Sequence, residues 1–373
     1  MIVREVDTTK RREVREFVDL PFKIYKDYPL WVPPLRRDAA SQLDKNRHPF
    51  FKNSEGAFFM AFDDQGNGLG RIAVLNNKPY NAHNTTATAF FYLFEVVDDF
   101  EAAQALFDAA FCWAKKRGLT DIFGPKGFAA LNGLGMLSRG YEHRPAFGIP
   151  YNPPYYPEFL GRLGFKKERE VLSGYLNSDM EIPEKIQVIA GKVQKRWGVR
   201  AERFESRRDL RKMIPHLKDL YNGSLGGTSG NAPLTDEEVN AMASQIIWFT
   251  DPRLIKILMK GDKAVGFLLA YPDISTALQR CKGRLFPFGW LFVLSELRRT
   301  NWVNVNGAGI IEEYRGLGGT AVLFNEMAKS IKDSRYEHAD LVQIGLENTK
   351  MQLELSSFGI DFYKSHSMYS REI

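Results

Sequence analysis

Cysteine is almost absent from this sequence. Only two cysteines, Cys112 and Cys281, occur in 373 residues, and they lie far apart in the chain. A disulfide framework or a cysteine-based metal site needs several cysteines at close spacings, so neither is predicted. We expect each cysteine to be an ordinary buried thiol, and we expect no metal site.

The sequence also lacks a long apolar segment. Residues 1–6 include the charged Arg4 and Glu5, and no apolar stretch follows them. No later run approaches the roughly 20 apolar residues that a membrane-spanning helix needs. The sequence therefore predicts neither a signal peptide nor a transmembrane helix, and we expect a cytoplasmic protein.

The charge is moderately basic, with a formal net charge of +6, and the basic residues occur in short groups. The sequence shows no Cys/His finger spacing, no aromatic RNA-binding motif and no long basic helix, so nucleic acid is not an expected partner. A basic balance also suits a small ligand that carries several phosphates.

Two halves of the chain show the same order of expected elements: a strand, two helices, three strands, a helix, a strand, a helix and a strand. A chain of 373 residues with 44% hydrophobic content is long enough for two cores. The boundary is expected near residues 177–183, which gives domains 1–178 and 179–373. No sequence identity between the halves is evident, so the repeat is one of pattern.

A glycine-rich turn in the second half is the strongest candidate for a binding site. Residues 303–311 read as a strand, residues 312–320 as a turn and residues 321–331 as a helix. Glycines at such a turn let backbone amides point outward together, and the helix start favours an anion. The turn is a candidate diphosphate site, although a tight turn without a ligand remains the alternative.

Two common phosphate loops fit this turn poorly. No Gly-Lys-Ser/Thr follows the glycines, which excludes a P-loop. The dinucleotide pattern is met only in relaxed form, by Gly316, Gly318 and Ala321, and its ribose-binding acid is not at the expected distance.

Arg315 and Gly318 instead resemble the Arg/Gln-x-x-Gly-x-Gly/Ala signature of the GNAT superfamily of N-acyltransferases, with Thr320 departing from it at the last position. The expected elements that follow have the superfamily's order: a strand over 338–348, a short helix over 349–358, Gly359 and a closing strand over 361–369. The resemblance implies two GNAT-like mixed α/β domains in tandem, each with a largely antiparallel central sheet flanked by helices.

The resemblance also implies a cofactor, acetyl-coenzyme A or a longer acyl-coenzyme A. Backbone amides near Ile310 and Ile311 would stabilise the oxyanion, and Asn348 would lie near the pantetheine arm. The diphosphate would be held by Arg315, Gly316, Gly318, Gly319 and Thr320.

The superfamily's usual acid is absent from its expected position in this chain. Members of the superfamily often carry a Tyr seven residues after the Asn, where this chain has Leu355. Tyr363 is the candidate replacement acid, and Glu312 or Glu313 is the candidate base. The alternatives are a packed strand aromatic for Tyr363 and solvated surface charges for the two glutamates.

The first half lacks the glycines at the matching position. Residues 95–100 carry carboxylates that would repel a diphosphate, so we expect this half to bind no coenzyme A by this route. Glu95 is a candidate base only if the halves face one another. Residues 151–157, rich in tyrosine and proline, form either a rigid ligand wall with residues 31–34 or a structural corner.

Residues 274–300 look like an addition to a minimal domain. The apolar run 285–294 would pack between the halves, line a site for an acyl chain or amphiphilic amine, or contact a membrane surface through residues 284–299. Two functions are consistent with the sequence. The first is transfer of an acyl group from acyl-coenzyme A to an amine, apolar or amphiphilic. The second is a catalytically silent acyl-coenzyme A or lipid-binding module.

Overall fold

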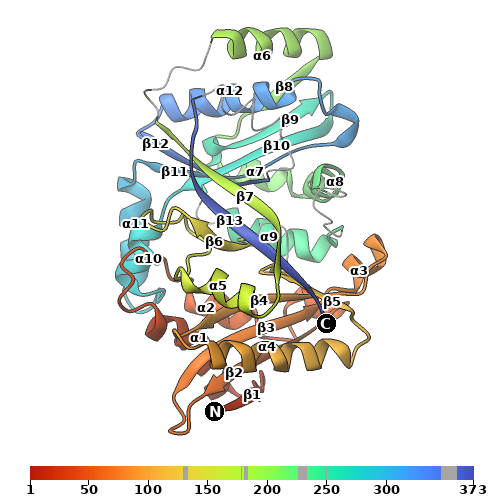
Figure 1. Cartoon of the computed structure of the whole chain (residues 1–373). Helices are drawn as coiled ribbons and strands as arrows, with labels where there is room; N and C mark the ends of the chain where they lie inside the picture. The colour runs from red at the N-terminus through yellow and green to blue at the C-terminus, as the bar shows by residue number, and fades with distance from the viewer. Residues whose placement is uncertain (129–132, 178, 180–183, 226–232, 248–249, 346–358) are drawn as a thin grey trace. The chain divides into compact units, whose positions relative to one another are not determined.

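The computed structural model describes the chain except for residues 129–132, 178, 180–183, 226–232, 248–249 and 346–358 (Figure 1). By proximity the chain groups into two compact units. The first comprises Met1–Leu172, Ser275–Ser295 and Lys364–Ile373, and the second comprises Ser173–Ile274 and Glu296–Tyr363. The units do not divide the chain at a single point, since two later segments also join the first unit. The domain boundary at residue 178 remains a prediction.

The first unit contains most of the elements from the N-terminal half, together with α10 from the C-terminal half. They are β1 (Ile2–Glu5), α1 (Arg11–Ile24), α2 (Arg36–Ser41), the 3-10 helix η1 (Pro49–Lys52), β2 (Glu55–Phe62), β3 (Gly68–Asn76), α3 (Lys78–Asn84), β4 (Thr88–Val96), α4 (Phe100–Lys115), β5 (Asp121–Gly124), β6 (Met136–Arg139), α5 (Tyr155–Arg162) and α10 (Ser275–Cys281). Three elements have residues in both units: β7 (Lys166–Asn177), α11 (Gly289–Arg299) and β13 (Asp361–Glu372).

The second unit repeats the pattern. Its elements are α6 (Glu184–Trp197), β8 (Val199–Glu202), α7 (Arg207–Lys212), α8 (Ile214–Leu225), α9 (Asp236–Ile247), η2 (Pro252–Leu254), β9 (Ile255–Lys260), β10 (Lys263–Pro272), β11 (Trp302–Ile310), η3 (Glu312–Tyr314), α12 (Gly319–Lys332) and β12 (His338–Gly345). The predicted short helix over 349–358 lies outside the described residues.

The two units have the same strand order, but each takes its sixth strand from the other half of the sequence. In the first unit the order is β1-β2-β3-β4-β5-β13, and in the second it is β8-β9-β10-β11-β12-β7. Each unit contains one parallel pair among the described pairings, β4 with β5 and β11 with β12. The pairs from β1 to β4, from β8 to β11 and between β5 and β13 are antiparallel. The tandem mixed α/β fold is therefore confirmed. The closing strands, expected to complete their own halves, are exchanged.

Local sequence signals explain how the helices begin. Asp99 caps α4 by accepting a hydrogen bond from the Ala102 amide at 3.1 Å, as predicted. Thr235 and Glu238 form the predicted capping box at α9, with 2.9 Å from the Thr235 amide to Glu238 Oε2. Cys112 was wrongly expected to be buried, because it lies on the exposed face of α4.

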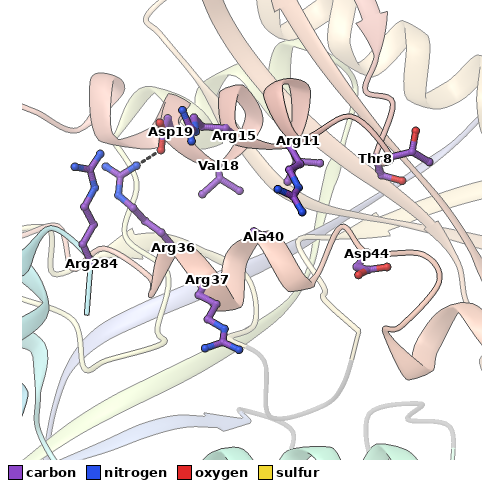
Figure 2. A pocket seen from close by; sticks show the side chains of 12 residues that line it. Thr8, Arg11, Arg15, Val18, Asp19, Arg36, Arg37, Ala40, Asp44 and Arg284 are labelled. Atoms are coloured by element: carbon purple, nitrogen blue, oxygen red, sulfur yellow. Dashed lines mark hydrogen bonds and ion pairs between the residues drawn. The ribbon is translucent and has the colours of Figure 1, made fainter. Parts of the chain in front are cut away.

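A cavity of about 700 Å³ lies within the first unit beside α1 and α2 (Figure 2). We call it the arginine pocket, because five of its lining residues are arginines: Arg11, Arg15, Arg36, Arg37 and Arg284. None of the helices in the described part of the chain combines the length and apolar character that crossing a membrane requires.

Candidate functional site

The predicted glycine turn joins the end of β11 to the start of α12. The chain leaves β11 at Ile310, passes through η3 and enters α12 at Gly319. Gly316 and Gly318 have φ values of +75° and +84°, in the left-handed region that favours glycine. The predicted strand, turn and helix are thus present, and the helix begins two residues earlier than expected.

Five consecutive backbone amides in this turn lack an acceptor in the part of the chain that the structure describes, and we call them the open amides. Among the described residues, the N–H groups of residues 316–320 donate to no protein acceptor. They lie at the positive end of α12, a helix of 14 residues, where an anion is favoured. This row of donors is what a diphosphate needs from a backbone site.

Close packing makes two of the glycines necessary. A Cβ on Gly318 would lie 2.7 Å from Val193 Cγ2 of α6, and one on Gly319 would lie 2.8 Å from Leu258 Cδ2 of β9. Both distances are shorter than real Cβ contacts, so the glycines let α12 start tightly against α6 and β9. This packing positions the open amides.

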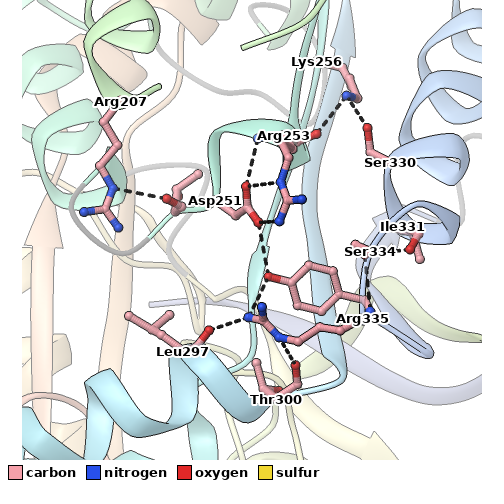
Figure 3. Close-up of polar contacts among 12 residues, drawn as sticks. Arg207, Asp251, Arg253, Lys256, Leu297, Thr300, Ser330, Ile331, Ser334 and Arg335 are labelled. Atoms are coloured by element: carbon pink, nitrogen blue, oxygen red, sulfur yellow. Dashed lines mark hydrogen bonds and ion pairs between the residues drawn. The ribbon is translucent and has the colours of Figure 1, made fainter. Parts of the chain in front are cut away.

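The far end of α12 is held by a polar network, drawn in Figure 3. Lys256 Nζ donates to the Arg253 carbonyl and to Ser330 Oγ of α12, both at 2.8 Å. Burial lowers the pKa of Lys256 to about 8, with a further contribution from the charge of Arg203. Asp251 accepts hydrogen bonds from Arg253 and Tyr336, which tie the turn after α12 to the same network.

Arg315, Ile310 and Ile311 are engaged by the protein itself. Arg315 donates from Nε to the Ile310 carbonyl at 3.1 Å and from Nη2 to the Ser224 carbonyl at 2.8 Å. The Ile311 amide donates to the Val265 carbonyl at 2.9 Å, and Ile310 lies opposite Gly266 in the β10–β11 ladder. Arg315 therefore braces the turn against α8, and the Ile311 donor is not open to an oxyanion.

The predicted acid and base residues do not gather at one point. Glu312 and Glu313 are exposed in η3, and Glu313 forms a salt bridge with Lys263 at 3.2 Å. Tyr363 is half-buried near the start of β13. Asn348 and Leu355 lie outside the described residues. The acid role of Tyr363, the base role of Glu312 or Glu313 and the contact of Asn348 with the pantetheine arm stay predictions.

The edge of β11 next to the turn is free of its parallel neighbour. Pairing between β11 and β12 covers Trp302–Val305 and His338–Leu341, and no further pairing is seen where the structure describes both strands. The register on the β10 side shifts between Leu268 and Ala270, which leaves an extra residue in β11, and Gly307 there has φ +114°. This bulge coincides with the end of the β11–β12 pairing, and no partner on that side of β11 is seen among the described residues.

A buried polar group beside the bulge was not anticipated from the sequence. Asn306 Nδ2 donates to Tyr271 Oη at 2.9 Å, and Asn304 Nδ2 donates to Asp273 Oδ1 at 3.1 Å. Burial raises the pKa of Tyr271 above its ordinary value, although the Asn306 hydrogen bond opposes the shift. Tyr271 therefore keeps its proton near neutral pH. In the sequence Tyr271 lies among apolar residues of the strand, so nothing there indicated that its hydroxyl takes part in a buried polar contact.

The matching position in the first unit is filled by side chains. The Val96 amide donates to Tyr156 Oη at 2.7 Å, and the hydroxyls of Tyr155 and Tyr156 donate to the Val96 carbonyl. Glu95 forms a salt bridge with Arg71 at 2.6 Å. The tyrosine-rich segment is thus a structural corner here, and the backbone groups at the end of β4 are occupied.

Comparisons with known proteins identify the fold. No family model matches the chain. It is 24% identical over 379 residues to Protein YghO of Escherichia coli K12, covering 97% of this chain and 94% of that protein. It is also 24% identical over 375 residues to the bacterial ceramide synthase of Caulobacter vibrioides, covering 97% and 95%.

Among solved structures, the chain is similar to a tandem GNAT protein from the clavulanic acid biosynthesis pathway. The TM-score is 0.58 at 11% identity, covering 100% of this chain and 98% of that one. The resemblance to the GNAT superfamily is therefore confirmed at the level of fold, for both halves of the chain.

Proposed function

We propose that this protein is an acyl-coenzyme A-dependent N-acyltransferase whose second unit transfers an acyl group to an amphiphilic amine. The observation that carries the proposal is the row of open amides from Gly316 to Thr320 at the start of α12. A GNAT fold with such a row in one half, and a tyrosine-filled counterpart in the other, supports one coenzyme site per chain.

The turn fits a coenzyme A diphosphate. The amides of residues 316–320 would hold its oxygens, with Gly318 and Gly319 keeping the amides in place. The separated edge of β11, from Asn306 to Ile310, would provide backbone hydrogen-bonding groups for the amide-bearing arm of the coenzyme. When bound, acyl-coenzyme A, either acetyl or longer, supplies an acyl group activated as a thioester.

Tyr271 is the group we assign to proton donation. Its hydroxyl lies beside the bulge of β11 and accepts a hydrogen bond from Asn306, which counters the rise in pKa that burial causes. A protonated phenol can stabilise or protonate a departing thiolate. It would take the part that the resemblance gives to a Tyr at the position of Leu355. A base role for Glu312 or Glu313 remains part of the proposal.

Two observations support an amphiphilic acceptor. One relative is named a ceramide synthase, and a ceramide is a long-chain amino alcohol acylated on its nitrogen. In addition, the apolar run after Arg284 is exposed on this protein, with Phe286 and Phe288 among its most exposed side chains. Exposed apolar surface of this kind is typical of proteins that meet lipid-like partners.

A thiol-release assay tests the proposal. The full chain is incubated with acetyl- or palmitoyl-coenzyme A and with either a short polar amine or a long-chain amino alcohol in detergent micelles. We expect coenzyme release with the long-chain amine and little with the short one. Saturable coenzyme binding without thiol release for any amine would contradict the proposal and favour a silent binding module.

A further inference from the structure

An apolar surface follows Arg284 in the first unit, and most of its large side chains are exposed to solvent. Phe286 and Phe288 are 76% and 68% exposed. Four more large apolar side chains in the first two turns of α11 are also exposed: Trp290, Leu291, Phe292 and Leu294. We call residues 286–294 the apolar face. The sequence left open whether this run packs in a core, and its exposure shows that most of it does not.

The backbone leading into the apolar face is built tightly. A Cβ on Gly283 would lie 2.2 Å from the Pro34 carbonyl oxygen, and one on Gly289 would lie 1.8 Å from the Arg284 carbonyl oxygen. The Arg36 amide donates to the Gly283 carbonyl at 3.0 Å, and Arg36 Nε donates to the Lys282 carbonyl at 3.1 Å. The segment is therefore fixed to the start of α2.

The same connection joins the apolar face to the arginine pocket, because Arg284 lines that pocket two residues before Phe286. In Figure 2, Arg36 points toward Asp19 and forms an ion pair with it. The pocket's other acid, Asp44, accepts hydrogen bonds from the amides of its own loop.

Four arginines of the pocket keep uncompensated charge. Within the described part of the chain, no salt bridge involves Arg11, Arg15, Arg37 or Arg284. Guanidinium groups bind phosphate oxygens in a two-pronged geometry, so several of them around one cavity favour a phosphate-bearing ligand. The arginine pocket matches the anionic headgroups at the surface of a bilayer, and the exposed aromatic side chains match the acyl-chain boundary beneath those headgroups.

We propose that the first unit docks on anionic phospholipid bilayers, with the apolar face inserted at the interface and a lipid phosphate held in the arginine pocket. This inference does not depend on acyl transfer. The charges of the pocket match the headgroups, and the apolar side chains match the boundary beneath them. Tryptophan and phenylalanine suit that depth, and the polar edge of Trp290 already bonds to the Pro287 carbonyl at 3.0 Å.

Vesicle flotation with the full chain tests the proposal, using phosphatidylcholine vesicles with and without 30% phosphatidylglycerol (about one anionic lipid in three, enough for a strong surface potential). We expect binding only to the anionic vesicles, weakened by salt. Arg37→Gln and Arg284→Gln should each reduce the partition coefficient about five-fold, since one basic residue near such a surface contributes on the order of 1 kcal/mol. Phe286→Ser should reduce it about ten-fold or more.

Matched controls exist on the same unit. Arg12 is exposed on α1 but does not line the pocket, and Ile2 is 55% exposed on β1. Arg12→Gln and Ile2→Ser should bind vesicles like the unaltered protein. Thermal melting of every variant checks that folding is intact.

Three results would overturn the proposal. The first is equal binding to zwitterionic and anionic vesicles, or no binding to either. The second is an effect of Arg12→Gln as large as that of Arg37→Gln. The third is calorimetric binding of inorganic phosphate that Arg37→Gln abolishes while vesicle binding stays unchanged, because the pocket would then serve a soluble anion.

Discussion

Replacing Gly318 by alanine tests whether the turn before α12 is a binding site or only a turn. Gly318 has φ +84°, a conformation that costs an L-residue about 1–2 kcal/mol. The new Cβ would also lie 2.7 Å from Val193 Cγ2, so the turn or α6 must shift. Relaxation of the turn would break the alignment of the open amides.

The expected size of the effect follows from the same cost. If the coenzyme requires the turn in its present conformation, the strain of about 1–2 kcal/mol weakens coenzyme A binding by roughly five- to thirty-fold. Adding Val193→Ala removes the atom in conflict and should restore part of the affinity. Isothermal titration calorimetry with coenzyme A measures the affinity of the single and the double variant.

A matched glycine separates binding from backbone strain. Gly66 has φ +82° in the β2–β3 hairpin, and no atom lies within 4 Å of a Cβ built there. Gly66→Ala should therefore have a similar left-handed cost and leave coenzyme affinity unchanged. Unchanged affinity in Gly318→Ala, with a loss of stability like that of Gly66→Ala, would refute the reasoning.

Three further predictions concern other groups of the protein. Tyr271→Phe removes only a hydroxyl and should lower kcat about 100-fold or more with little change in KM; an unchanged kcat would show that Tyr271 is not the acid. If one of the glutamates is the base, Glu312→Gln or Glu313→Gln should lower kcat about 100-fold, and two active variants would reject both. Burial lowers the pKa of His366 to about 4. The unfolded chain therefore binds a proton between pH 6.5 and 4 that the folded protein does not, and about 2 kcal/mol of stability is lost from pH 7 to pH 5. Urea unfolding at pH 7 and pH 5 measures this loss of stability, which should be smaller in His366→Gln and unchanged in His83→Gln, an exposed control. An equal loss in both variants would contradict the assignment.

Local patterns carried most of what the sequence could predict. The strand, glycine turn and helix around residues 303–331, the α4 cap at Asp99 and the capping box at Thr235 each depend on residues a few positions apart. Such local signals can be recognised in the sequence without knowledge of the rest of the fold. The tandem architecture followed because they recur in the same order in both halves.

Long-range contacts explain what the sequence could not show. The exchange of β7 and β13 pairs strands far apart in the chain, and no local pattern encodes it. The hydrogen bond from Arg315 to the carbonyl of Ser224, which braces the glycine turn, joins residues 91 positions apart. The apolar run 285–294 has the composition of a core segment, and only the fold shows that most of it is exposed.

A crystal structure of the protein with coenzyme A tests the central claim most directly. We predict diphosphate oxygens within hydrogen-bonding distance, about 3 Å, of the amide nitrogens in residues 316–320. Coenzyme density at another place, with those amides left to water at saturating ligand, would contradict the account.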